Sequence, residues 1–132
     1  MVGLAATEEI SKMQSIKIAP PNSILLIEDR SGGVVPSITR GQRIWSTPSC
    51  IVFGCLAFMD GETDVTLGVA TDVDPGTPPA FEGLLETPNL SVVVSTVEWK
   101  TVLWAQVLSK KTWIRIWTNR SQEPDKVVIG IG

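Results

Sequence analysis

The acidic side chains in the middle of the chain are those best suited to acid–base chemistry. They form two groups along the sequence: Asp60, Glu62 and Asp64, followed by Asp72 and Asp74. A pair of carboxylates can supply the general acid and the general base of a hydrolase. The segment that begins at Asp72 also resembles the start of a calcium-binding loop, but Thr77 and Gly83 stand where that loop needs glycine and glutamate. We expect no metal site, and we interpret this acidic loop as a solvated surface or, as an alternative, the site of a carboxylate-based hydrolase.

Histidine is absent from all 132 residues. Ser-His-Asp and Cys-His catalysis are therefore impossible within this chain, and the commonest metal ligand is missing. An odd separation in a predicted strand places Cys50 and Cys55 on opposite faces, about 16 Å apart, which is too far for a disulfide. We expect two buried free thiols, no cofactor and, unless the acidic loop is catalytic, no enzymatic activity.

The aromatic residues are unusual, because there are five tryptophans and no tyrosine. Two of the tryptophans lie in a predicted strand where residues alternate between the two faces. Trp113 and Trp117 share one face with Arg115, and Ile114 and Ile116 share the other. If the isoleucines face the core, this stripe faces outward, and Trp104 joins it provided that the preceding strand forms a hairpin. Because Trp and Arg are enriched in binding hot spots, we predict a surface for another protein or a second copy of the chain. In the alternative, residues 1–12 or the long loop 71–79 cover the stripe, or it faces inward.

The charge distribution argues against several partners. The net charge is −3, and Lys110-Lys111 is the longest basic run, so we expect no nucleic acid to bind. The longest apolar stretch, residues 50–59, has half of the roughly 20 residues that a membrane span needs. The first residues lack the positive region of a signal peptide. We expect a cytoplasmic protein that does not associate with membranes.

The apolar pattern predicts eight or nine short strands at spacings typical of a sandwich or barrel. Asp60-Gly61 predicts a hairpin between strands at 51–59 and 63–69, and Ser109-Lys110-Lys111 predicts another after residue 108. Residues 97–108 fit a strand or a helix, and we favour the strand. Residues 34–45 fit an edge strand or an ordered loop. The fold class is all-β: a single-domain antiparallel β-sandwich or barrel, with residues 1–12 as a tail or short helix and 13–132 as the domain.

The order of these features resembles small bacterial β-sandwich proteins of the competence protein J and nuclease-inhibitor type. The features are the alternating opening strand, Cys50-Ile51-Val52-Phe53 before a charged turn, and Thr112-Trp113-Ile114-Arg115-Ile116-Trp117 near the end. The resemblance spans about residues 13–131 and implies a cytoplasmic protein that binds and blocks an enzyme, often a nuclease. It assigns no functional residue in this sequence.

Three functions are therefore in competition. The first is a non-enzymatic protein-binding module of the inhibitor or immunity type, supported by the missing catalytic groups and the aromatic stripe. The second is a structural protein that assembles with itself through that stripe or through an unprotected sheet edge. The third is the carboxylate-based hydrolase.

Overall fold

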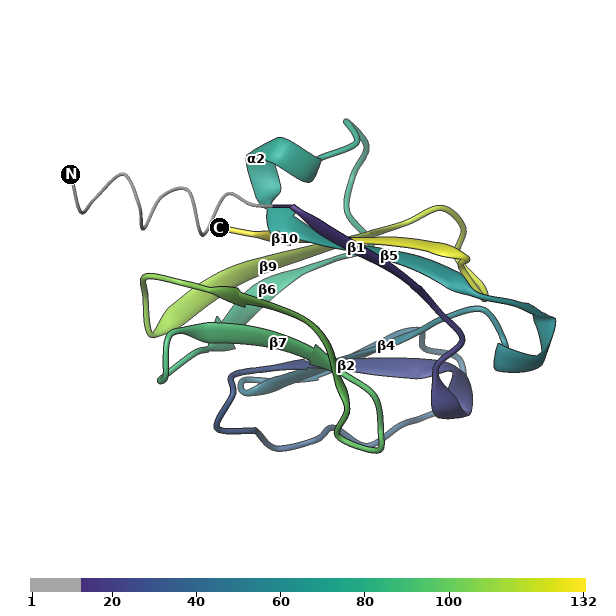
Figure 1. Ribbon diagram of the computed structural model, residues 1–132, viewed down its shortest axis with the longest axis horizontal. Helices are drawn as coiled ribbons and strands as arrows, with labels where there is room; N and C mark the ends of the chain where they lie inside the picture. Colours follow the sequence, from purple (N-terminus) through teal and green to yellow (C-terminus); the bar gives the residue numbers. More distant parts are fainter. Residues whose placement is uncertain (1–12) are drawn as a thin grey trace.

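Two five-stranded sheets packed face to face make up the described part of the computed structural model, residues 13–132 (Figure 1). In spatial order, sheet A consists of β1 (Gln14–Ile18), β5 (Thr63–Val69), β10 (Lys126–Ile131), β9 (Lys111–Thr118) and β6 (Phe81–Glu86). Sheet B consists of β3 (Ile44–Thr47), β4 (Cys50–Gly54), β2 (Ile24–Glu28), β7 (Ser91–Ser95) and β8 (Thr101–Gln106). The short helices are η1 (Pro21–Ser23), η2 (Phe58–Asp60) and α2 (Ala70–Val73).

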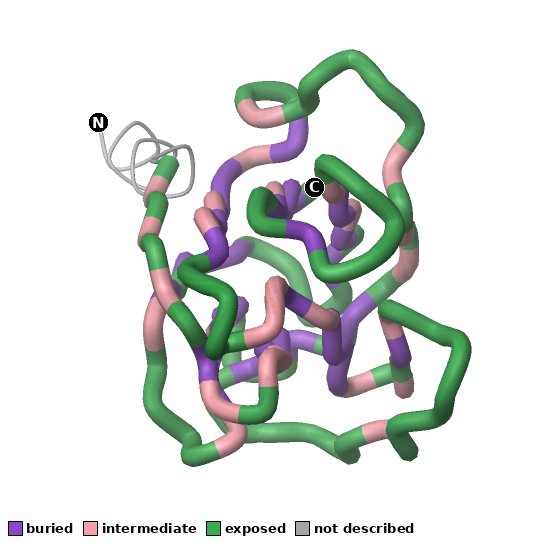
Figure 2. The backbone as a smooth tube through the Cα atoms, turned by 90° about the vertical axis from the view of Figure 1, so that its right-hand side faces the viewer, coloured by how far each residue is buried: buried purple, intermediate pink, exposed green. Residues whose placement is uncertain are grey.

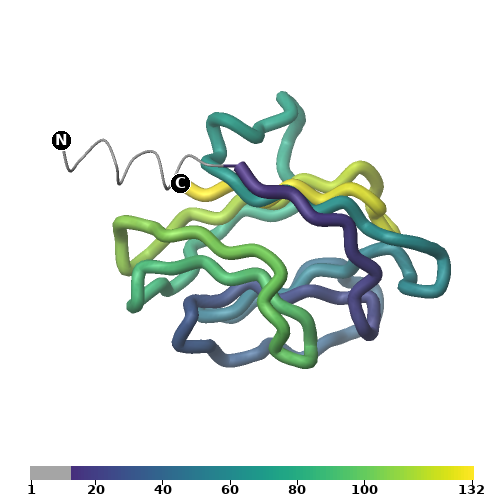
Figure 3. The backbone as a smooth tube through the Cα atoms, viewed as in Figure 1, coloured from purple at the N-terminus to yellow at the C-terminus, as the bar shows by residue number. Residues whose placement is uncertain are grey.

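The predicted all-β sandwich is confirmed, with ten strands in the described residues. The strand expected within residues 97–108 is β8. Strand pairs are antiparallel with one exception, because β10 pairs with β5 in parallel and with β9 antiparallel. Figure 3 shows the yellow C-terminal strand lying beside the teal β5, so segments about half the chain apart are neighbours at the centre of sheet A.

The core lies between the sheets and follows from the alternation of apolar residues along the strands. Every second residue of a strand points to the same face, so one set from each strand meets the opposing sheet. Figure 2 shows the buried segments gathered in the interior and exposed chain around them. The largest fully buried side chains include Leu25, Ile27, Ile51, Phe53, Leu67, Leu85, Ile114, Ile116 and Ile129.

A second, smaller apolar cluster covers the outer face of sheet B. It consists of Leu26, Trp45, Cys50 and Val52. The segment 29–43 contributes to its cover, since the indole N–H of Trp45 donates to the backbone oxygen of Thr39 at 3.2 Å. Within this segment, residues 34–43 form an ordered loop, because β3 begins only at Ile44. β4 is therefore covered on both faces, by the main core on one and by this cluster on the other.

The two predicted hairpins are wrong, because each links strands of different sheets. β4 pairs with β3 and β2, so it has no edge to offer β5. The strand also ends at Gly54, and Phe58 and Met59 lie exposed in and beside the turn. Likewise, the segment 107–110 carries the chain from β8 in sheet B to β9 in sheet A. The chain does turn at both places, but each turn carries it from one sheet to the other.

Both cysteines are free and buried, on opposite sides of sheet B. Cys50 belongs to the outer cluster and Cys55 to the main core. Burial raises the pKa of each thiol to about 12, and the neighbouring Glu28 adds to the effect at Cys50. The thiols therefore stay protonated and unreactive.

The expectations for residues 1–12 lie outside the described residues. Between residues 13 and 132, no helix is long and apolar enough to cross a bilayer.

Gly130 permits a close approach between sheet A and α2. A Cβ added there would lie 2.8 Å from Cζ3 of Trp117 and 3.0 Å from Cα of Ala70. We expect Gly130→Ala to lower the free energy of unfolding by about 1–3 kcal/mol through overpacking, measured by urea denaturation.

Gly54→Ala is the matched control, because the nearest atom to its added Cβ is the backbone oxygen of Arg43 at 3.7 Å. Its free energy of unfolding should change by less than about 0.5 kcal/mol. Equal losses in the two variants would mean that loss of glycine itself, and not the fit against Trp117, sets the cost.

Candidate binding surface

Trp113 and Leu84 form the apolar centre of the outer face of sheet A. They lie directly opposite each other in the register of β9 and β6. Trp113 and Leu84 are each 49% exposed, although Ile114, the next residue after Trp113, is fully buried. The buried isoleucine holds the backbone in place, so the indole is presented from a rigid strand at little cost in entropy.

Charged pairs flank this apolar centre on both sides. Lys111 lies opposite Glu86, and Arg115 lies opposite Glu82, with 3.0 Å between Nε of Arg115 and Oε2 of Glu82. The Nε–H of Arg115 does not point at the carboxylate, so this contact is an ion pair without hydrogen-bond geometry. We call these six residues the Trp113 face: Glu82, Leu84, Glu86, Lys111, Trp113 and Arg115. An apolar centre with a polar rim is the common anatomy of a protein interface.

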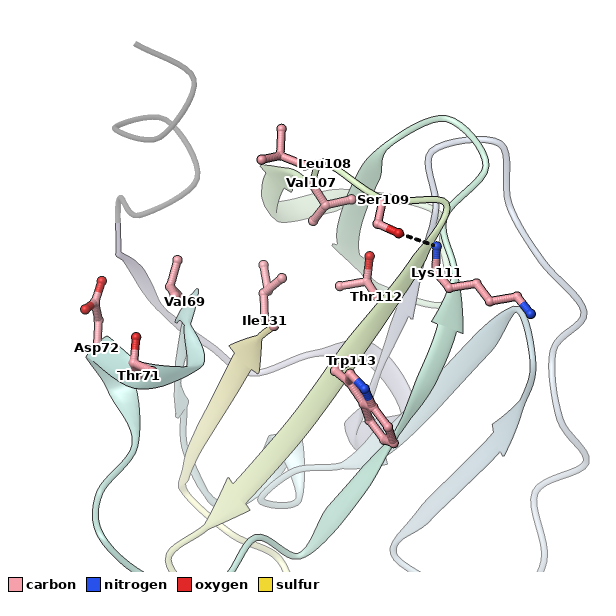
Figure 4. Close-up of a pocket in the computed structure, with 11 residues that line it drawn as sticks. Val69, Thr71, Asp72, Val107, Leu108, Ser109, Lys111, Thr112, Trp113 and Ile131 are labelled. Atoms are coloured by element: carbon pink, nitrogen blue, oxygen red, sulfur yellow. Dashed lines mark hydrogen bonds between the residues drawn. The ribbon is translucent and has the colours of Figure 1, made fainter. Parts of the chain in front are cut away.

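An apolar hollow of about 570 Å³ adjoins the Trp113 face. Figure 4 shows Val69, Thr71 and Asp72 on one side, Lys111 and Trp113 on the other, with Ile131 between them and Leu108 above. Leu108 is strongly exposed. This volume is in the range of ligand and side-chain binding pockets.

Trp117 does not belong to the exposed surface. Its side chain points to the outer face as predicted, but only 4% of it is exposed. The long loop covers it, and the indole N–H donates to the backbone oxygen of Thr77 at 2.8 Å. The prediction of a three-residue outward stripe is therefore wrong at Trp117, and the alternative of cover by the long loop applies there.

Trp104 is also separate from Trp113. It is exposed on β8, on the outer face of sheet B, because the expected hairpin between β8 and β9 does not form. Its surroundings include Arg30, Val93 and Gln106. The four predicted residues thus divide into an exposed Trp113 with a partly buried Arg115 on β9, a buried Trp117, and Trp104 on the opposite sheet.

The predicted acidic loop is split between the two ends of β5. Asp60, Glu62 and Asp64 precede or begin this strand, whereas Asp72 and Asp74 follow it. Seven strand residues separate the groups by about 20 Å, too far for one pair of catalytic carboxylates. Asp64 also lies between Lys17 and Lys126 on the neighbouring strands. In the described residues, no three acidic or cysteine side chains converge as a metal site would require.

A basic segment is the feature that the sequence interpretation missed. Residues 30–43, which we call the arginine loop, contain Arg30, Arg40 and Arg43 and no acidic residue. They also expose Val34, Val35 and Ile38. The net negative charge of the whole chain does not show this local excess of positive charge. A count of charge along the sequence would have found it. Leu84 and Leu108 were missed because a leucine beside other apolar residues carries no signal of exposure in the sequence.

Two neighbouring carboxyl groups at the base of the arginine loop behave in opposite ways. Burial opposes ionisation of Asp29, but hydrogen bonds from Ser31 and Asn89 outweigh it and lower its pKa to about 2. These bonds include Ser31 Oγ to Oδ2 at 2.6 Å and Asn89 N to Oδ1 at 3.0 Å, which tie the loop to the turn before β7. Burial raises the pKa of Glu28, whose Oε2 has no hydrogen-bond partner.

The fold and this surface define a class of protein: a two-sheet β-sandwich with a half-exposed tryptophan on the outer face of one sheet. No family model matches the sequence, and no curated protein matches it. Among solved structures, the chain is similar to ComJ from Bacillus subtilis, described as an inhibitor of the DNA-degrading activity of NucA. The similarity covers 91% of this chain and 93% of ComJ, with a TM-score of 0.61 and 10% sequence identity. It confirms, at the level of the fold, the resemblance that the sequence predicted.

The two tryptophans of β9 give opposite predictions for stability. Trp117→Ala should lower the free energy of unfolding by about 3–5 kcal/mol, because it empties a buried site. Trp113→Ala should change it by less than about 1 kcal/mol, because the side chain is half exposed. Chemical denaturation of both variants is the measurement. Similar losses would contradict the assignment of Trp117 to the covered part of the face.

Asp29 gives a prediction for pH. Its folded pKa of about 2 is below the ordinary 3.8, so its ionised form stabilises the fold above about pH 4. That contribution is lost as the pH falls from about 4 to about 2. Asp29→Asn should therefore reduce stability at neutral pH, by about 1–2 kcal/mol, and flatten the dependence across this range.

Denaturation at a series of pH values tests this expectation. Asp60→Asn, the same change at an exposed carboxylate that does not contact Asp29, is the control for loss of one charge. If Asp29→Asn keeps the wild-type dependence on pH, Asp29 is not the group that titrates.

Proposed function

We propose that this chain is a non-enzymatic protein-binding module of the inhibitor type, which contacts an enzyme through the Trp113 face. One observation carries the proposal: an indole with 49% of its surface exposed is fixed on a strand whose alternate residues are fully buried. A half-exposed aromatic side chain in a monomer gains by being covered, and a rigid one loses little entropy when it is.

The chemistry of the chain agrees with a binding role. Histidine is absent, the acidic residues are distributed over both ends of β5, and both thiols are protonated. The fold shared with ComJ adds a nuclease as the first class of enzyme to test. An acidic chain suits a partner whose contact surface is basic, as the substrate site of a nuclease is. We place the protein in the cytoplasm with such an enzyme.

The test is a DNA-degradation assay with a panel of purified nucleases, NucA among them, titrated with the wild-type protein. A member of the panel should be inhibited with one-to-one stoichiometry. Trp113→Ala should weaken that inhibition by about 30-fold or more, the typical effect of a hot-spot tryptophan.

Trp104→Ala is the matched control, since it removes an equally exposed indole from the other sheet. Inhibition that falls equally in both variants would remove the Trp113 face from the mechanism. If no nuclease is inhibited, the nuclease-inhibitor function fails. DNA cleavage by the protein alone would favour the hydrolase instead.

A further inference from the structure

A pocket of about 630 Å³ lies on the outer face of sheet B, at the start of the arginine loop. Trp104 and Val93, which lie opposite each other on β8 and β7, both line it. The indole is 57% exposed, and the amide of Gln14 fixes the strand beneath it by donating to the backbone oxygen of Trp104 at 2.6 Å. The volume is in the range of small-molecule sites. We call this site the Trp104 pocket.

Hydrogen bonds around one buried carboxylate hold two segments of the pocket wall in place. Asp29 is 2% exposed, and it accepts from the backbone N–H of Asn89 at 3.0 Å and from Ser31 Oγ at 2.6 Å. Ser91 Oγ in turn accepts from the backbone N–H of Arg30 at 3.0 Å. The turn before β7 is therefore joined to the start of the arginine loop, and little entropy would be lost when a ligand binds between them.

Leu90 lines the same pocket from a backbone conformation that leucine rarely adopts. Its φ is +57°, in a turn where its N–H donates to the backbone oxygen of Thr87 at 2.9 Å. Glycine adopts this conformation without steric cost, whereas a residue with a Cβ is strained there. The side chain is 37% exposed, so burial within this chain compensates for the strain only in part. Strain of this kind gathers at binding sites.

The charged group of the pocket lining is the guanidinium of Arg30. Within residues 13–132, the ion pairs are made by Arg115 and Arg120, so no carboxylate at contact distance neutralises Arg30. None of the described residues that line the pocket is acidic. The pocket therefore favours an anion, although the chain as a whole carries a net charge of −3.

Trp104 and Arg30 suit different parts of one ligand. Arg30 follows β2 and Trp104 lies on β8, with β7 between these strands, so their backbones are separated by about 10 Å or more across the sheet. An exposed indole stacks on a flat ring, and a guanidinium binds a phosphate through paired hydrogen bonds. The Gln106 amide and the Thr101 hydroxyl also line the pocket, and both groups can donate and accept, as a sugar or the edge of a base requires.

We infer that the Trp104 pocket binds a nucleoside monophosphate, with the base stacked on Trp104 and the phosphate at Arg30. A ligand of this class joins a flat ring to an anion through a polar sugar, which matches the three kinds of group in the lining. One phosphate needs one arginine and no extended basic surface. The inference therefore agrees with the expectation that no nucleic acid binds.

Calorimetric titration with each of the four nucleoside 5′-monophosphates tests this inference. At least one of them should bind the wild type with one-to-one stoichiometry. The nucleoside, which lacks the phosphate, and ribose 5-phosphate, which lacks the base, should each bind at least about tenfold more weakly. If no nucleotide binds at millimolar concentration, the proposal is overturned. Ribose 5-phosphate that binds as tightly as the nucleotide would also overturn it, because the base would then make no contact with Trp104.

Two variants separate the contacts of the base and the phosphate. Trp104→Ala should weaken nucleotide binding at least about tenfold through loss of stacking. Arg30→Gln should bind the nucleotide no more tightly than the nucleoside. Trp99→Ala and Arg40→Gln are the matched controls, because they change an exposed tryptophan and an exposed arginine that do not line the pocket. Equal losses in variants and controls would place the nucleotide elsewhere and overturn the proposal.

The inference does not depend on the proposed function, because the Trp113 face belongs to the other sheet. Trp113→Ala should bind the nucleotide like the wild type, and Trp104→Ala should inhibit a sensitive nuclease like the wild type. Nucleotide binding without inhibition of any nuclease would refute the inhibitor role alone. Inhibition by a protein that binds no nucleotide would refute the nucleotide site alone.

Discussion

The burial of Ile114 and Ile116 determines which side chains of β9 lie on the outer face of sheet A. Both side chains are fully enclosed between the sheets, and a strand that buries two alternate residues must turn the intervening ones outward. Trp113, Arg115 and Trp117 consequently share the outer face, and no rotation of β9 can exchange them without emptying the core. The exposure of each of these side chains depends on whether another segment covers the strand at that position. Trp117 is covered where the long loop and α2 cross, and Trp113 is left open where they do not.

The same constraint acts differently on the two sheets. Sheet B buries a second cluster on its outer face, which the arginine loop helps to cover, so that loop is exposed there in place of part of the sheet. On sheet A, by contrast, the side chains of β9 and β6 are themselves exposed, at the Trp113 face. A small sandwich therefore carries two chemically different surfaces, one aromatic and flanked by charged residues of both signs, the other aliphatic and cationic. Asp29 stabilises the base of the second surface through hydrogen bonds to its carboxylate, whereas the neighbouring Glu28 is buried with one oxygen unsatisfied.

Strand positions were predictable from sequence because they depend on local alternation. The isoleucines of β9 and the separate environments of the two thiols follow from that alternation alone. Strand pairing was not predictable, since Asp60-Gly61 specifies a turn without specifying which sheet receives the next strand. The error at Trp104 follows from this gap, whereas the separation of the two acidic groups already follows from the predicted strand at 63–69. The cover over Trp117 depends on Thr77, forty residues away in sequence, and no local pattern encodes such a contact.

The position of β10 has a consequence for the order of folding. This strand is the last of the ten to leave the ribosome, yet it occupies the middle of sheet A, between β5 and β9. Until it is made, β1 and β5 form one piece, β6 and β9 form another, and nothing joins them by backbone hydrogen bonds. Sheet B, whose strands all precede β9, can assemble earlier. The nascent chain thus passes through a stage in which the inner face of sheet B lacks a complete partner, a period of exposure to aggregation that ends when the central strand inserts.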